Sequence, residues 1–317
     1  MIFNKDNNGS RELHAITGCF DAGNDFLSVQ SDIELETENV IEFIGRSVYE
    51  RAEAAYYNEP QGSTATDGQL VMLVQRVIAL FAVLRYHRGN LVTHASTGRK
   101  VGVDVENEKL AWEWMIDRDD EAMQRKAYAA LDILLRWLED TQMQEWLDTP
   151  RRAELRALMV PSLAAVERYY YIDGSHRFFL ILAPLLRDVQ ERDVRPLLKE
   201  RYETILAEAH RDQTEPSILL RQVQGAIVLQ AMSEAVQRFS VKLLPEGVVR
   251  QFQASSQTKR ASETASLAMI EAVSAQLEKR AARYFDDIKK EIGQLGNEYA
   301  DYQLLPTNDP KNNYFRT

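Results

Sequence analysis

Apolar residues recur at helical spacing along most of the chain. A first helix is expected to begin near Thr37, with one buried face formed by Ile41, Ile44, Val48, Ala52 and Ala55. The next segment, 68–87, is apolar almost all round, which predicts a helix at the centre of its domain. Residues 106–140 return to helical spacing, with a break expected near 117–119.

Between these helices the period of the pattern changes from helix to strand. Val101, Val103 and Val105 alternate with other residues, and Gly98 offers a turn, so residues 91–105 predict a short β-hairpin.

The second half of the chain repeats the helical signal. Thr149 and Pro150 predict a helix cap followed by proline at the first helical position. Further helices are expected over 151–158, 161–170, 175–189, 194–210, 218–239 and 261–292. Residues 241–252 are apolar and contain Gly247, which suggests a second hairpin with this glycine in its turn.

The two halves also resemble each other in sequence. Val74–Leu80 is similar to Val223–Leu229 at an offset of 149, and the same offset places Gly98 on Gly247. The predicted fold is therefore mainly α, with two tandem helical modules that each carry a short β-hairpin. The expected division is an N-terminal arm (1–36), module 1 (37–150), a central aromatic seam (151–195), module 2 (196–296) and a C-terminal tail (297–317).

Composition narrows the class of protein. The 317 residues are 45% hydrophobic and 27% charged, which is typical of a globular protein with a sizeable core. The net charge of −10 disfavours nucleic-acid binding but is compatible with DNA sliding past an acidic wall. The single cysteine, Cys19, excludes an internal disulfide, and the longest apolar run, 70–84, is too short for a membrane span, so we expect a buried helix and no membrane.

One stretch of the predicted seam is dense in aromatic residues around a short polar turn. Three consecutive tyrosines cannot all face one core, so at least one is expected to be exposed or to contact a partner. The candidates for seam or interface positions are Tyr169, Tyr170, Tyr171, Asp173, Gly174, Arg177 and Phe178.

The same turn contains the residue types of a nucleophilic triad: Asp173, Ser175 and His176. Neighbours in a turn rarely face one another, so we favour the alternative that Asp173 or Ser175 caps the following helix. The five histidines lack the spacing of a metal site. No catalytic, cofactor-binding or metal-binding residue is therefore predicted, and the protein is not expected to be an enzyme.

Two segments carry a resemblance to a known family. The run Tyr170–Phe179, followed by Ala183-Pro184-Leu185, resembles a domain-of-unknown-function family of Bacteroides phages and prophages. The run Ala127–Glu139, which contains Ala-Leu-Asp before Leu-Leu, is similar to a second segment of that family. The resemblance covers roughly residues 40–295, and its motifs are not catalytic.

The order of helix, helix, hairpin and helix in each half also resembles the small head–tail connector (adaptor) proteins of tailed phages. This resemblance implies a ring-forming neck subunit, located in the virion neck after assembly in the bacterial cytoplasm. The implied partners are further copies of itself, the portal protein and other neck or tail proteins, with DNA passing without specific binding and no cofactor. Two alternatives remain: a helical adaptor outside the virion, or a hydrolase that uses Asp173, Ser175 and His176.

Overall fold

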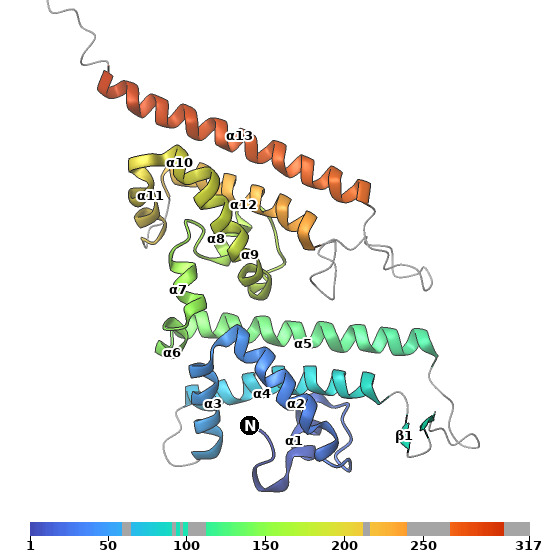
Figure 1. Ribbon diagram of the computed structural model, residues 1–317. Helices are drawn as coiled ribbons and strands as arrows, with labels where there is room; N and C mark the ends of the chain where they lie inside the picture. Colours follow the sequence, from blue (N-terminus) through green and yellow to red (C-terminus); the bar gives the residue numbers. More distant parts are fainter. Residues whose placement is uncertain are drawn as a thin grey trace, which may run out of the picture. The chain divides into compact units, whose positions relative to one another are not determined.

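The computed structural model describes residues 1–58, 65–90, 93–95, 98–100, 112–211, 216–239 and 267–300 (Figure 1). These residues are mostly helical, which confirms the mainly α prediction. The chain forms two compact units. The first consists of Met1–Glu154 with Ser175–Phe178, and the second of Leu155–Gly174 with Phe179–Thr317. The predicted seam, 151–195, is thus divided between the units and is not a part of its own.

The first unit is built around helix α4 (Ala65–Gly89), against which α1, α2, α3 and α5 all pack. Ten of its side chains are buried, including Leu70, Val77 and Leu80, which is the central position predicted for residues 68–87. The other elements of this unit are η1 (Lys5–Asn7), α1 (Gly9–Thr17), α2 (Leu27–Ile44), α3 (Arg46–Asn58), α5 (Glu113–Thr141), α6 (Gln144–Leu147) and the start of α7 (Pro150–Arg156).

Among the described helices, α4 is the one long and apolar enough, by length and composition, to cross a membrane. However, 61% of its apolar window is buried inside the protein. This burial is the behaviour of a core helix, as expected for residues 70–84.

The predicted N-terminal arm is wrong, because residues 1–36 fold onto the first unit. Ile2, Phe3, Leu13 and Phe20 are at most 1% exposed, and α1 packs against α4. The apolar residues of this segment are not periodic, since short helices and turns separate them. Their burial therefore comes from tertiary packing and not from a helical face visible in the sequence.

Several helix ends differ from the prediction. Helix α2 begins at Leu27, so Thr37 lies inside it, buried, with its hydroxyl donating to the Ile33 carbonyl at 2.7 Å. Gly45, at φ +86°, separates α2 from α3. Helix α5 runs through residues 117–119 without the predicted break, since it contains neither glycine nor proline.

The two predicted hairpins are not supported as elements of the modules. Among the described residues the strands are β1 (Thr93–Ala95) and β2 (Gly98–Lys100), which pair antiparallel with Ala95 opposite Gly98. Gly98 therefore begins a strand of three residues. The alternating valines at 101–105, and the whole of the second predicted hairpin with Gly247, lie outside the described residues.

The second unit is dominated by two helices that lie side by side, α12 (Ile218–Phe239) and α13 (Leu267–Ala300) (Figure 1). Helix α12 has the bounds predicted for it. Helix α13 continues to Ala300, so the predicted tail begins inside a helix, and residues 301–317 lie outside the described range. The remaining elements are α8 (Leu163–Glu167), most of α9 (His176–Val189), the π-helix η2 (Gln190–Val194), α10 (Arg195–Leu198), η3 (Lys199–Arg201) and α11 (Tyr202–Ala209).

The segment 194–210, predicted as one helix, is broken into shorter pieces. Lys199 has a positive φ of 49°, which interrupts a regular α-helix between α10 and α11.

Two buried glutamines bind the backbone of Met159. Gln190 Oε1 accepts from the Met159 amide at 2.7 Å, and Gln224 Nε2 donates to the Met159 carbonyl at 2.8 Å. Their amides satisfy backbone groups that would otherwise be buried without partners.

Candidate functional site

The three tyrosines of the predicted interface have different environments in the second unit. The Tyr169 hydroxyl donates to the Arg221 carbonyl at 2.7 Å, and its ring lies edge-on to Tyr284 at 6.0 Å between centroids. Burial, with a further contribution from Tyr284, raises the pKa of Tyr169 to about 12. Tyr170 is half-buried, whereas Tyr171 is 72% exposed. One tyrosine of the three is thus open to solvent.

The turn that follows uses left-handed backbone. Asp173 and Gly174 have φ values of +58° and +63°. The exposed Asp173 carboxylate accepts from the Tyr171 hydroxyl at 3.0 Å, and the Gly174 amide donates to the Glu167 carboxylate at 2.8 Å. Asp173 therefore stabilises the turn locally and does not cap α9.

In the first unit, Ser175 caps helix α9, which was one of the two alternatives from the sequence. Its Oγ accepts from the Phe178 amide at 3.1 Å, as in a standard N-cap. The same hydroxyl donates to the Asp132 carboxylate, with distances of 3.1 and 3.2 Å to the two oxygens. The Arg177 amide also donates to Asp132, at 2.8 Å.

Asp132 thus places a negative charge at the positive end of α9. Two unpaired amides of the first helical turn find acceptors, Phe178 on Ser175 and Arg177 on Asp132. The Arg177 guanidinium lies 3.8 Å from the centre of the Tyr128 ring, in a cation–π contact. Asp132 and Tyr128 lie one helical turn apart on α5, so this helix holds both the backbone and the side chain of Arg177.

These contacts do not form a catalytic triad. A general base must lie within hydrogen-bond reach of the nucleophile. In the described part of the chain no hydrogen bond joins His176 to Ser175 or to Asp173, and the Ser175 hydroxyl is already engaged with Asp132 and with the Phe178 amide. Burial lowers the pKa of His176, so its ring is neutral at pH 7.

Within the described ranges, no group of three or more His, Cys, Asp or Glu side chains is placed to hold a metal ion. Cys19 is exposed and free.

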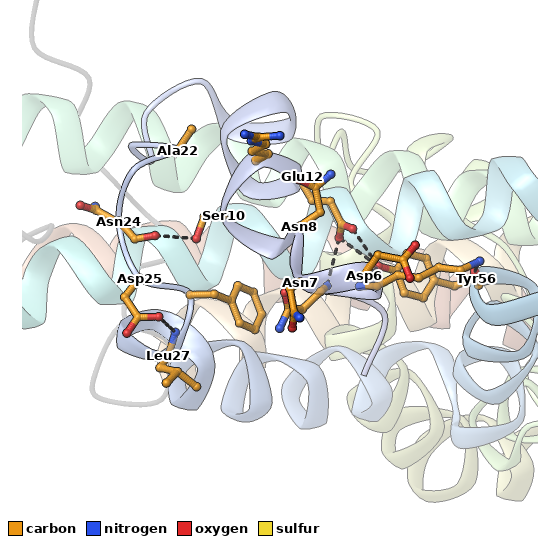
Figure 2. A pocket seen from close by; sticks show the side chains of 14 residues that line it. Asp6, Asn7, Asn8, Ser10, Glu12, Ala22, Asn24, Asp25, Leu27 and Tyr56 are labelled. Carbon is orange, nitrogen blue, oxygen red and sulfur yellow. Dashed lines mark hydrogen bonds between the residues drawn. The ribbon is translucent and has the colours of Figure 1, made fainter.

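A second polar feature of the first unit is an open hollow of about 970 Å³ beside the N-terminal segment (Figure 2). Its polar groups bind one another: the Tyr56 hydroxyl donates to the Glu12 carboxylate at 2.9 Å, and Ser10 donates to the Asn24 carbonyl at 2.6 Å. The Lys5 ammonium donates to the Tyr56 carbonyl at 3.1 Å. These bonds attach the first residues to α3, and they explain how a segment rich in Asn and Asp is held in place.

Asp132 is the residue that sequence reasoning missed as a contributor to this site. In the sequence it is only part of the run that resembles a family, although it is a half-buried carboxylate next to buried Leu131 in the apolar stretch 127–135. A carboxylate in such a position suggests a fixed partner. The partner lies 43 to 45 residues away, which no local pattern shows.

Comparison with known proteins supplies a family but no activity. A family model described as "Family of unknown function (DUF6712)" matches twice, over residues 40–154 and 182–312. No curated protein and no solved structure matches the chain. Since the two matches cover well over half of its length, the chain belongs to the DUF6712 family of unknown function.

Proposed function

We propose that this protein is a structural subunit of the neck of a tailed phage, a head–tail connector that assembles as a ring next to the portal protein. In this proposal it contains two tandem adaptor-like modules, the first centred on α4 and α5 and the second on α12 and α13. It acts by assembly and docking in the virion neck, after synthesis in the host cytoplasm. The resemblance to phage adaptors supports this proposal, and the following features of the molecule agree with it.

The observation that carries the proposal is a shared burial pattern in the two central helices. With the offset of 149, buried positions of α4 fall on buried positions of α12. The pairs are Leu70 and Leu219, Val74 and Val223, Val77 and Ala226, Ile78 and Ile227, Ala79 and Val228, Leu80 and Leu229, Ala82 and Ala231, Val83 and Met232, and Leu84 and Ser233. Nine of the ten buried residues of α4 thus have a buried counterpart in α12, which supports a duplication, whereas Leu73 falls on half-buried Gln222.

The long helices share part of this pattern at an offset of 150, although buried Ala130 of α5 falls on exposed Arg280 of α13. Ala127, Leu131 and Leu138 of α5 fall on Leu277, Ala281 and Ile288 of α13, and all six are buried. The first two pairs exchange alanine for leucine in opposite directions, as expected when two cores are repacked around the same helix arrangement. The two matches of the family model, over residues 40–154 and 182–312, are compatible with a duplication.

The negative charge is concentrated in the first unit, as expected for a surface that DNA passes without binding. The first unit has 17 Lys and Arg against 27 Asp and Glu, whereas the second has 21 of each, so the first unit carries the whole net charge of −10. From Glu12 to Gly45 there is no Lys or Arg, and Glu34, Glu38 and Glu42 are exposed on one face of α2. Such a surface repels phosphate and offers DNA little adhesion.

The proposal is tested with purified protein by light scattering and electron microscopy, alone and with the portal protein of the same phage. A closed ring of defined copy number that binds the portal is expected. A strictly monomeric protein under both conditions contradicts the proposal. Mass spectrometry of purified virions separates the remaining alternative, because an adaptor outside the virion would be missing from the particles.

A further inference from the structure

We infer that Asn8 is a site of spontaneous deamidation, and that the side chain of Asn4 holds this reaction back in the folded protein. The site lies wholly in the first unit, and the inference does not depend on the proposed function. Asn8 and Gly9 form the one Asn-Gly pair of the sequence, and helix α1 begins at this glycine. Asparagine is most labile when glycine follows it, because glycine has no side chain to shield its backbone nitrogen or to restrict its rotation.

The reaction consumes water and proceeds through a cyclic imide. The Gly9 backbone nitrogen gives up its proton to a base in solution and attacks the side-chain carbonyl carbon, Cγ, of Asn8. A five-membered succinimide forms, and the side-chain nitrogen leaves with a proton as ammonia. Water then opens the ring. Attack at Cγ leaves an aspartate in the normal chain, whereas attack at the main-chain carbonyl gives an isoaspartate, in which the chain runs through the side-chain carbons.

The Asn8 side chain has no structural role that would protect it. Asn8 stands at the N-cap position of α1, where an asparagine side chain commonly accepts a hydrogen bond from the first turn, but here it makes no such bond. The residue is exposed and lines the open hollow beside the N-terminal segment (Figure 2). The carbon that is attacked is therefore accessible to water.

The attacking nitrogen, in contrast, is held in place. Gly9 is buried, and its N–H donates to Asn4 Oδ1 at 3.0 Å. Asn4 is itself fixed, since its backbone amide donates to the Glu12 carboxylate at 3.2 Å. The Tyr56 hydroxyl donates to the same carboxylate at 2.9 Å. A buried nitrogen whose proton is already bonded is harder to deprotonate, so these contacts oppose the first step.

The backbone geometry of Asn8 is a second barrier. At a ψ of 12° the Gly9 nitrogen nearly eclipses the backbone nitrogen of Asn8, so it is turned away from the Asn8 side chain. Closing the ring requires rotation about this bond. That rotation displaces the Asn8 carbonyl, which accepts from the Arg11 and Glu12 amides at 3.1 Å. The first turn of α1 must therefore open before the ring can close.

Packing explains why glycine occupies a position that makes its neighbour labile. A Cβ on Gly9 would lie 2.4 Å from the Phe26 ring and 2.9 Å from Cβ of Asn4. Any other residue would have to displace Phe26, which is 7% exposed. The isoaspartyl product lengthens the main chain by one carbon directly before this contact, so it cannot rebuild the same turn. Opening of this segment is thus recorded as a covalent change.

The test is peptide mapping by mass spectrometry after the full-length protein is incubated in mildly alkaline buffer, with and without guanidinium chloride. In the native wild type, conversion at Asn8 should be slower than in the denatured protein by about tenfold or more. Native Asn4→Gly should convert about fivefold faster than the native wild type, because it frees the Gly9 N–H. Glycine suits the left-handed backbone at this position, where φ is +69°, so the variant adds no strain.

Two matched variants serve as controls. Asn4→Asp keeps an acceptor oxygen and should not convert faster than the wild type. Asn24→Ala changes an exposed asparagine of the same hollow and should leave the rate at Asn8 unchanged. Equal rates in the native and the denatured wild type, or an unchanged rate in Asn4→Gly, overturn the protection by Asn4. No conversion at Asn8 under either condition overturns the modification site.

Discussion

Removal of the Asp132 carboxylate is the perturbation that most directly tests the cap of α9. In Asp132→Ala, the Arg177 amide loses an acceptor at 2.8 Å and the Ser175 hydroxyl loses one at 3.1 Å. Both bonds involve a charged acceptor, and such bonds contribute about 1.5 to 3 kcal/mol each when buried. The site is half-buried, so water replaces part of this, and we expect a loss of about 2–3 kcal/mol in the free energy of unfolding.

Two further variants separate the contributions of the charge and of the serine cap to this loss of stability. Asp132→Asn keeps one acceptor oxygen but removes the charge at the positive end of α9, and should cost about 1 kcal/mol. Ser175→Ala removes the cap of the Phe178 amide and should also cost about 1 kcal/mol. Because Ser175 donates to Asp132, the double variant should be less destabilised than the sum of the single ones.

The assay is urea unfolding followed by circular dichroism, with amide hydrogen exchange as the local measurement. The Arg177 and Phe178 amides should exchange more than tenfold faster in Asp132→Ala, since both depend on the cap. Asp140→Ala is the control, because Asp140 is an exposed carboxylate on the same helix, and it should change stability by less than about 0.5 kcal/mol. If Asp132→Ala behaves like this control in both measurements, the cap does not hold α9 in the way described.

Four other variants are predicted. Gly225→Ala should destabilise the α12–α13 pair by about 1–2 kcal/mol in urea unfolding, because an added Cβ would lie 2.7 Å from the Tyr284 ring. Gly293→Ala, where nothing lies within 4 Å, should instead stabilise α13 by about 0.5–1 kcal/mol; destabilisation by both would contradict the packing argument. His176→Asn should make stability less dependent on pH between 7.5 and 5. Folding lowers the pKa of His176, so the unfolded state takes up the proton first as the pH falls. The wild type therefore loses stability below about pH 6.5, and the variant should not. Equal pH profiles of the two proteins would count against burial of His176. Tyr169→Phe should cost about 1 kcal/mol, since it removes the hydroxyl that donates to the Arg221 carbonyl; unchanged stability would show that the bond contributes nothing.

Helices with a continuous apolar pattern were predictable from the sequence. The segment 218–239 has the bounds expected for it, and 68–87 lies inside the longer α4. Both are core helices, so their hydrophobic pattern and their tertiary environment favour the same structure. The capping of α7 by Thr149 is likewise local, and its hydroxyl accepts from the Arg152 amide at 3.2 Å as predicted.

The predictions that were wrong share one physical cause, which is packing against residues that are distant in the sequence. Residues such as Phe3 and Phe20 are buried by other elements and not by their neighbours along the chain. Thr37 has the preference of a cap, but its hydroxyl bonds back to a carbonyl four residues earlier, which is compatible with the middle of a helix. Local propensity was overridden in each case by burial against α4 or within α2.

The partnership of Asp132 with the start of α9 joins two segments that are far apart in the sequence. Asp132 lies within the family match over residues 40–154, whereas Ser175 and Arg177 lie between the two matches. The Ser175 hydroxyl donates to Asp132 and accepts from the Phe178 amide. The described contacts therefore give Asp132 and Ser175 one shared role, which is to cap the first turn of α9.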